Sequence, residues 1–275
     1  MRRKRYLDES QGRVCDNLWL HEEVGHTDEA KKQLKALFDG SAPFDTPKPV
    51  RLIDRILTIA SSPSSVVLDF FSGSATTAEA TIHKNAEDGG NRRFVLVQIP
   101  EKASGQFSTL TEIGKERIRR AGAKIAAEVE ESNRQLQLGE EPKRIPDIGF
   151  RVLKLDESGI ARPEPGQLVL DRIKPDRSDE DIIFEMMLKW GVELTYPIEK
   201  AEVGGYPCHS VAADSLICCM QEGLTVQALQ AIADLDPDRV LILDSVLDDT
   251  LKLNALQIFK RAEERTQKKI DLRTV

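Results

Sequence analysis

An acidic residue that ends an apolar run, followed by small residues and a helical pattern, is the feature of this sequence best suited to chemistry. The run VVL at residues 66–68 leads into Asp69, and then come two phenylalanines, a Ser-Gly-Ser turn and a helix opening near residue 75. Open α/β sheets build nucleotide sites where a strand ends beside the N-terminus of a helix. Only Gly73 stands where the dinucleotide fingerprint needs three glycines. The pattern therefore predicts a smaller, zwitterionic nucleoside ligand rather than a pyrophosphate.

S-adenosylmethionine is a ligand whose groups suit these side chains, since it carries a sulfonium, an amine, a carboxylate, a ribose and an adenine. Asp69 can face the cationic amine, and Gly73 lets the backbone come close to the ligand. The helix N-terminus with Thr76 and Thr77 suits the carboxylate. The Phe70–Phe71 pair can flank the adenine or the sulfonium. Each residue alone has an ordinary structural explanation, a cap for Asp69 and a core contact for the phenylalanines, so the prediction depends on the combination.

The end of the next strand is expected to contact the ribose of such a ligand. Dinucleotide-binding folds place an acid at this point. Here the apolar run at residues 93–98 ends in Gln98, and Glu101 follows shortly after it. We therefore expect Gln98 near the ribose, with Glu101 as the second choice.

The sequence over residues 44–98 predicts a helix, a strand, a helix and a strand, which must position these residues. Pro49 suits the first turn of a helix that runs to residue 60. Buried strands are expected from residue 66 and over 93–98, with a helix over 74–85 between them. A strand–helix–strand unit of this kind is a right-handed crossover of a parallel sheet.

A long helix is predicted over residues 110–136, where Thr109 and Glu112 have the spacing of a capping box. Its basic residues are expected mainly on the exposed side. Lys115, Arg117 and Arg120 are accordingly candidate DNA contacts, although a solvated helix face would explain them equally well.

The remaining chain is predicted to form a linker over residues 139–149, rich in Pro, Gly and charge, and a C-terminal α+β domain over 150–275. Residues 1–138 form the first domain. The strands expected in the second domain lie at residues 150–155, 197–203, 206–211, 215–220 and 240–244, and its helices at 179–190, 225–235 and 248–265.

Composition excludes several classes of protein. The 275 residues carry a net charge of −7, which argues against a protein that simply coats nucleic acid but leaves a DNA enzyme possible. The four cysteines and four histidines are scattered without metal-ligand spacing, so we expect no metal site and reduced thiols. Neither a secretion signal nor a membrane-spanning run is evident. We therefore expect a cytoplasmic protein that does not bind membranes.

Three segments taken together closely resemble amino-type DNA methyltransferases, and more narrowly the modification subunits of type III restriction-modification systems. They are FDTPKPVRLIDRIL at residues 44–57, VLDFFSGSATTAEA at 67–80 and NRRFVLVQIPE at 91–101. The resemblance covers nearly the whole chain, because it continues through segments at residues 4–12, 112–122, 147–156, 184–200 and 240–260.

The resemblance implies part of a Rossmann-like, S-adenosylmethionine-dependent methyltransferase sheet, with a smaller C-terminal α/β domain that contacts a subunit or partner. It also implies methyl transfer to the N6 amine of adenine in double-stranded DNA after base flipping. The partners it implies for the full-length enzyme are a second modification chain, as a homodimer, and the restriction subunit. Carried over by position, the cofactor-binding residues are Thr46, Lys48, Pro49, Asp69, Phe70, Phe71, Ser72, Gly73, Ser74, Thr76, Thr77, Gln98 and Glu101.

Departures from the family pattern limit what this chain can do alone. Ala75 stands where a second glycine is common, and Gln98 replaces the usual acid. The catalytic Asp-Pro-Pro-Tyr tetrapeptide does not occur in the sequence, and no catalytic residue is assigned. The chain therefore looks like the C-terminal portion of a modification subunit, which binds cofactor but is inactive by itself. The alternative is a non-catalytic interaction module with a vestigial cofactor site. A small-molecule or RNA methyltransferase is a weaker reading, because the Thr-Pro-Lys-Pro segment marks the DNA-modifying group.

Overall fold

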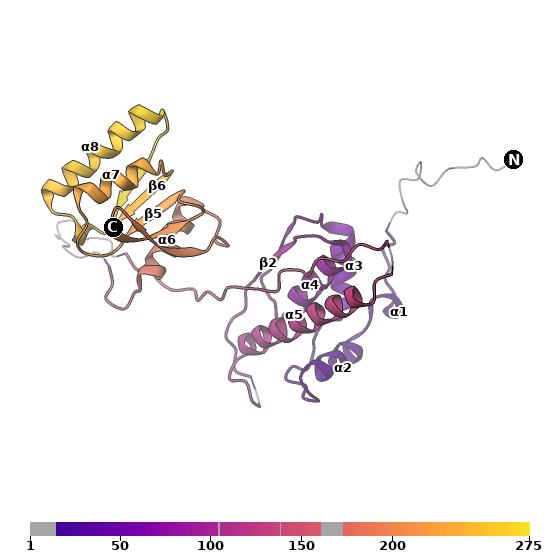
Figure 1. Ribbon diagram of the computed structural model, residues 1–275. Helices are drawn as coiled ribbons and strands as arrows, with labels where there is room; N and C mark the ends of the chain where they lie inside the picture. Colours follow the sequence, from indigo (N-terminus) through magenta and orange to yellow (C-terminus); the bar gives the residue numbers. More distant parts are fainter. Residues whose placement is uncertain (1–14, 104, 138, 161–172) are drawn as a thin grey trace. The chain divides into compact units, whose positions relative to one another are not determined.

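The computed structural model describes residues 15–103, 105–137, 139–160 and 173–275 (Figure 1). The resemblance at residues 4–12 falls outside these ranges. The described chain divides into two compact units, one ending at Phe150 and the other beginning at Arg151. The two units are described separately below. No helix of the described residues is long and apolar enough to cross a membrane.

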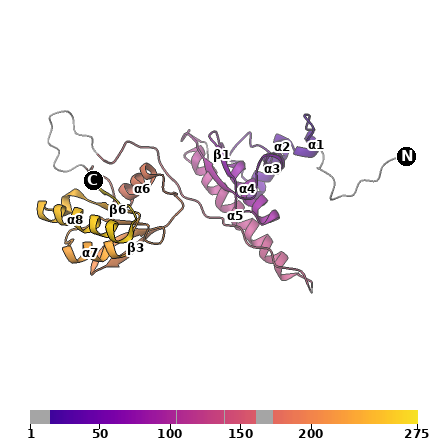
Figure 2. The same cartoon turned by 90° about the horizontal axis from the view of Figure 1, so that it is seen from above.

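The first unit contains the helices and strands expected around the candidate loop, with small shifts of their ends. In chain order these are α1 (His21–Val24), α2 (Thr27–Leu37), α3 (Val50–Ala60), β1 (Val66–Asp69), α4 (Thr76–Asp88), β2 (Arg93–Leu96) and α5 (Leu110–Arg134). Helix α4 lies between α3 and α5 (Figure 2). The predicted capping box at α5 is confirmed: Glu112 N–H donates to Thr109 Oγ1, and the Glu112 carboxylate accepts from Thr109 N–H.

The two strands of this unit pair in parallel, with Val67 opposite Phe94 and Leu68 opposite Val95. Side chains alternate across the sheet, so residues 67, 94 and 96 share one face and residues 66, 68, 93, 95 and 97 share the other, where Arg93 is the charged member. Phe94 and Leu96 pack on the apolar core formed by α4 and α5.

The other face is uncovered, and the prediction that both strands are buried is wrong for it. Val66, Leu68, Val95 and Val97 are 53%, 60%, 49% and 51% exposed. The reason is that α4 and α5 cover the sheet from one side only. The apolar runs in the sequence place apolar residues on both faces of the sheet. Within the described part of the chain, helices cover only one of these faces.

The second unit is an α+β fold built on a five-stranded sheet. Its elements are α6 (Asp179–Trp190), β3 (Ile198–Val203), β4 (Tyr206–Val211), β5 (Leu216–Cys219), α7 (Val226–Asp234), β6 (Arg239–Ile242), a 3₁₀ turn (Asp244–Val246), α8 (Asp249–Thr266) and β7 (Asp271–Thr274). The strand order is β3-β4-β5-β6-β7, antiparallel from β3 to β5 and parallel from β5 to β7.

Helices cover both faces of this sheet. Helices α7 and α8 lie side by side over one face (Figure 1), and α6 packs on the other. The adjacent residues Cys219 and Cys218 point into these two different cores, as their positions on one strand predict. Both are free thiols, as are Cys208 and Cys15.

One expectation for the junction between the units, a strand at residues 150–155, is wrong. Residues 150–155 form no strand, because no strand within the described ranges pairs with them, and the side chains of Val152, Leu153 and Leu155 are exposed. Part of the predicted linker is also packed, since Ile148 and Phe150 lie against the core formed by α4 and α5. Strand β7 and the short helix α1 were not predicted.

Candidate functional site

The candidate loop runs from the end of β1 at Asp69 to the start of α4 at Thr76, and Asp69 fixes both of its ends. One carboxylate oxygen accepts from Phe71 N–H at 3.1 Å, and the other accepts from the Thr77 hydroxyl at 2.5 Å. Asp69 therefore does act as a cap, which the sequence alone had left open. Each oxygen retains a second lone pair that can accept from a ligand.

The turn of the loop is held from the end of the second strand. Gly73 has φ 53° and donates its N–H to Gln98 Oε1 at 2.8 Å. Val97 extends the pairing by donating to Asp69 O and accepting from Ser72 N–H. The Gln98 amide, predicted to lie near a ribose, is thus part of the scaffold that shapes the loop.

Ala75 occupies the N-cap position of α4 in a left-handed conformation, with φ 62° and ψ 37°. This conformation costs an L-residue roughly 1–2 kcal/mol relative to glycine. Ala75 is buried against the α4–α5 core, and no side chain caps the first turn of α4. The N–H groups at this helix start therefore lack a side-chain acceptor, which is the arrangement that binds an anion.

Arg117 reaches the loop from α5 and corrects a prediction. Its side chain is only 1% exposed, and its Nε donates to Glu79 Oε2 on α4 at 2.6 Å. Its Nη1 donates to Ser74 Oγ at 2.9 Å and to Thr76 Oγ1 at 2.7 Å. The expected place of Arg117 on the exposed face is wrong, because this guanidinium is buried and donates through Nε and Nη1 to groups inside the unit.

The spacing in α5 carried a signal that this reasoning missed. Arg117 lies four residues after Ile113 and four before Ala121, both of which are buried. Residues at this spacing share one helix face. The basic residue was therefore on the apolar stripe, and charge alone was a poor guide to exposure.

The segment before α3 lies against the same loop. The Thr76 hydroxyl donates to the Lys48 carbonyl at 3.3 Å. A β-carbon at Gly73 would meet the ring of Phe44 at 3.8 Å. Pro49 is buried at the start of α3, whereas the side chains of Thr46 and Lys48 are exposed. The structure thus brings residues 44–49 to the loop, as the predicted site requires.

The two phenylalanines after Asp69 are not core residues. Phe70 is 61% exposed and Phe71 is 80% exposed, with ring centroids 5.1 Å apart and the rings tilted by 55°. An exposed aromatic pair at the end of a strand is a surface on which a planar or cationic group can rest.

The remaining predicted residues, Glu101, Lys115 and Arg120, differ in their exposure and contacts. Glu101 has an exposed side chain, and its carbonyl accepts from Leu110 N–H at the start of α5. Arg120 donates to Glu116, Asp39 and the Leu37 carbonyl, and the Glu116 and Asp39 carboxylates raise its pKa. Lys115 is half-buried. Arg120 therefore ties α5 to the end of α2.

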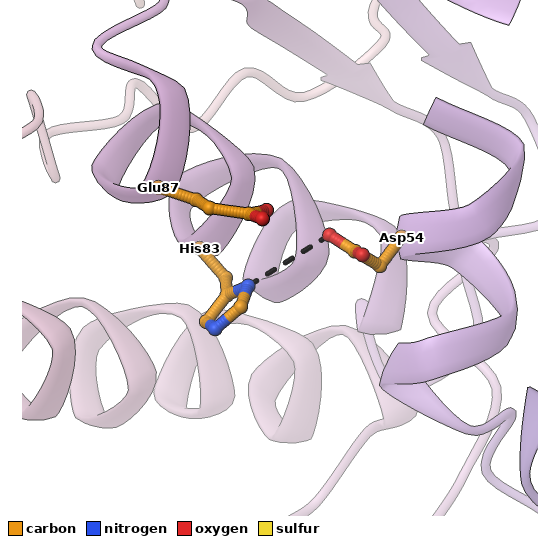
Figure 3. A group of neighbouring side chains, drawn as sticks. All are labelled: Asp54, His83 and Glu87. Carbon is orange, nitrogen blue, oxygen red and sulfur yellow. Dashed lines mark ion pairs between the residues drawn. The ribbon is translucent and has the colours of Figure 1, made fainter. Parts of the chain in front are cut away.

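A second polar group lies between α3 and α4 and involves a histidine that the sequence left isolated. Asp54, His83 and Glu87 have ligand atoms within 4.8 Å of one another, with His83 Nδ1 3.8 Å from Asp54 Oδ1 (Figure 3). Lys84 Nζ binds Glu87 at 2.8 Å, and this hydrogen bond lowers the pKa of the Glu87 carboxyl. Since Lys84 supplies positive charge here, we describe the group as an ion-pair cluster that joins two helices.

Comparison with known proteins supplies the context for this geometry. Residues 1–123 match the DNA methylase family N6_N4_Mtase. The StyLTI Mod subunit, from a type III restriction-modification enzyme of Salmonella typhimurium, is 41% identical over 138 residues, which is 48% of this chain and 21% of the relative. The EcoP15I Mod subunit of Escherichia coli is 26% identical over 266 residues, which is 88% of this chain and 38% of the relative.

A further type III enzyme subunit, the EcoPI Mod subunit of Escherichia phage P1, is 29% identical over 237 residues, covering 81% of this chain and 34% of the relative. The chain therefore spans between about a fifth and two fifths of the length of these relatives.

Proposed function

Residues 1–123 match the DNA methylase family and the chain is similar to type III modification subunits, and from this premise we propose that it binds S-adenosylmethionine at the loop between β1 and α4. It would supply the cofactor-binding portion of a DNA adenine-N6 methyltransferase with a Rossmann-like sheet. The matches confirm the predicted resemblance to the family. The cofactor, the residues that hold it and the activity of this chain are proposals.

One observation carries the proposal: the loop is held in place from three sides, while each Asp69 oxygen keeps a second lone pair for a ligand. Asp69 on β1, Gln98 after β2 and Arg117 on α5 each fix part of it. A loop shaped in advance loses little conformational entropy when a ligand binds. This arrangement supports a retained site rather than a vestigial one.

The proposed contacts follow from the charge of each ligand group. The carboxylate of Asp69 would accept from the ligand amine, and the uncapped N–H groups at the start of α4 would donate to the ligand carboxylate. Phe70 and Phe71 would lie along the adenine or the sulfonium. Lys48, which makes no ion pair within the described residues, would approach the methionine end.

The catalytic step would require a second stretch of polypeptide. The family's Asp-Pro-Pro-Tyr tetrapeptide is absent from this sequence. We propose that methyl transfer to DNA occurs only when another polypeptide segment supplies it. In the complete enzyme, double-stranded DNA, a second modification chain and the restriction subunit would be partners.

A methylation assay tests this function. The purified chain would be incubated with plasmid DNA and S-adenosylmethionine labelled in the methyl group, with a type III Mod subunit as positive control. We expect no label in DNA but ultraviolet cross-linking of label to the chain, lost in Asp69→Asn. Labelled DNA would refute the claim that catalysis needs a further segment, and no cross-link would contradict cofactor binding.

The second candidate function is an interaction module, favoured by a specific feature of unit 2. Leu253 and Leu256 lie one helical turn apart on α8 and are 62% and 60% exposed. An apolar pair on an outer helix face suits contact with another protein. This candidate would prevail if a restriction subunit bound the chain and S-adenosylmethionine did not.

A further inference from the structure

The ion-pair cluster between α3 and α4 contains a buried oxygen that its ion pairs do not satisfy. Asp54 Oδ1 is shielded from solvent and accepts no hydrogen bond from the described residues. A buried carboxylate oxygen normally accepts one, because its loss of hydration is otherwise uncompensated. His83 Nδ1 faces this oxygen at 3.8 Å, which is too long for a hydrogen bond. A cation between these two atoms would satisfy both of them.

Glu87 completes a set of three ligand atoms that come from two helices. His83 and Glu87 lie one turn apart on the same face of α4, and Asp54 points toward them from α3 (Figure 3). One atom from each of the three side chains lies within 4.8 Å of the other two. Ligand atoms of a tetrahedral Zn²⁺ stand about 2.1 Å from the metal and hence about 3.4 Å apart. Small side-chain rotations would therefore bring all three atoms to one ion.

Lys84 is the positive charge that such an ion would have to tolerate. Its Nζ donates to Glu87 Oε2 at 2.8 Å, and its side chain is only 11% exposed. This hydrogen bond occupies one Glu87 oxygen and leaves the other with free lone pairs. With His83 neutral, the two carboxylates exceed the one ammonium, so the cluster still attracts a cation. Lys84 weakens that attraction without abolishing it.

The cluster is also open enough for an ion to enter. The side chains of His83 and Glu87 are 52% and 55% exposed, whereas Asp54 lies deeper, at 29%. An ion can therefore approach from solvent, and water can fill the remaining coordination position.

We propose that Asp54, His83 and Glu87 form a Zn²⁺ site that locks α3 to α4, with water as the fourth ligand. An imidazole together with two carboxylates suits Zn²⁺ better than Mg²⁺ or Ca²⁺, which prefer oxygen ligands alone. The site does not depend on the proposed function, because it involves neither the cofactor nor DNA.

The expectation of no metal site came from spacing among cysteines and histidines. That criterion cannot detect carboxylates on a neighbouring helix. Here the packing of α3 against α4 places Asp54 beside His83.

Calorimetric titration of the untagged chain with ZnCl₂ tests the proposal. The Cys15→Ser background removes the exposed thiol, which could bind zinc by itself. We expect saturable binding of one Zn²⁺ per chain. An ion concentration of about 100 times the Kd should raise Tm by about 5–10 °C, whereas an excess of Mg²⁺ should not.

Variants in the same background place the ion. His83→Ala and Asp54→Asn should each lower Zn²⁺ affinity by about tenfold or more, because one removes a ligand and the other removes a negative charge. The control is His21→Ala, which removes another exposed histidine that faces a carboxylate, Glu22, at 3.2 Å. It should leave the affinity unchanged. His83 is exposed, so its variant should keep the circular dichroism of the original chain.

Lys84→Met distinguishes a metal site from a group that only forms ion pairs. Removing the ammonium frees Glu87 and removes a repulsive charge, so Zn²⁺ affinity should rise by about threefold or more. The proposal is overturned if the chain shows no saturable zinc binding, if His83→Ala binds as well as the original chain, if His21→Ala abolishes the binding, or if Lys84→Met weakens it.

Discussion

Replacing Arg117 with methionine is expected to weaken cofactor binding as well as stability, because this residue joins α5 to the candidate loop. Methionine keeps much of the volume but removes the donors to Glu79, Ser74 and Thr76. The Glu79 carboxylate, only 20% exposed, would then lose its ion-pair partner. The loop would lose two hydroxyl contacts that fix its path into α4.

The magnitudes follow from these contacts. Removing one partner of a buried ion pair costs about 3–5 kcal/mol, and partial exposure of Glu79 favours the lower end. For a unit of this size that corresponds to a fall in Tm of about 10 °C. Freeing the backbone of two loop residues costs about 2–4 kcal/mol when the ligand orders them again. We therefore expect affinity for S-adenosylmethionine to fall by about 30- to 1000-fold.

The matched control is Arg92→Met. Arg92 is a second buried guanidinium of the same unit, 3% exposed, and it pairs with Asp88 at 2.9 Å. It lies at the far end of α4 from the loop. Calorimetric titration and thermal unfolding of both variants should show similar losses of Tm, with affinity reduced only for Arg117→Met. Equal affinities in the two variants would refute the view that Arg117 positions the loop.

Three further predictions concern stability and reactivity. Thr109→Ala should lower the free energy of unfolding by about 1 kcal/mol, because it removes the α5 capping box; chemical denaturation measures this, and an unchanged midpoint would contradict it. The hydrogen bond from Arg92 lowers the pKa of Asp88, so the stability that this pair adds is present above the unfolded pKa and is lost as pH falls below about 4. In Asp88→Asn the Tm should therefore fall less steeply with acid than in the original chain. Curves of Tm against pH that run parallel for the two proteins would argue against this. Burial raises the pKa of the Cys218 and Cys219 thiols, so a disulfide reagent should modify only the exposed Cys15 in the folded chain and all four thiols in denaturant; rapid modification of more than one folded thiol would contradict the packing.

Local patterns in the sequence were sufficient to predict the strand–helix–strand unit and its loop. The apolar run before Asp69, the small residues after it and the capping box at Thr109 act over a few residues each, so neighbouring chain determines them. The prediction that residues 44–49 close on the loop came from the family resemblance instead. It depends on a contact between Lys48 and Thr76 that no local pattern reports.

Features that depend on distant partners were predicted poorly. Arg117 was assigned to the exposed side from its charge, although Glu79 and two hydroxyl groups satisfy that charge inside the unit. Residues 150–155 are rich in apolar side chains like a strand, but no strand within the described ranges pairs with them. Val66, Leu68 and Val95 are apolar like core residues, although no helix of the described chain covers their face of the sheet. In each case the missing information was the identity of the neighbour.

The most direct test of the central claim is calorimetric titration of the purified chain with S-adenosylmethionine and S-adenosylhomocysteine. Asp69→Asn is the comparison, because an amide oxygen can still accept from Phe71 N–H while the negative charge is lost. The account predicts saturable binding to the original chain and at least a tenfold loss in the variant, about 1.4 kcal/mol or more. A folded chain that binds neither ligand, or binds both equally well without the Asp69 charge, would contradict it.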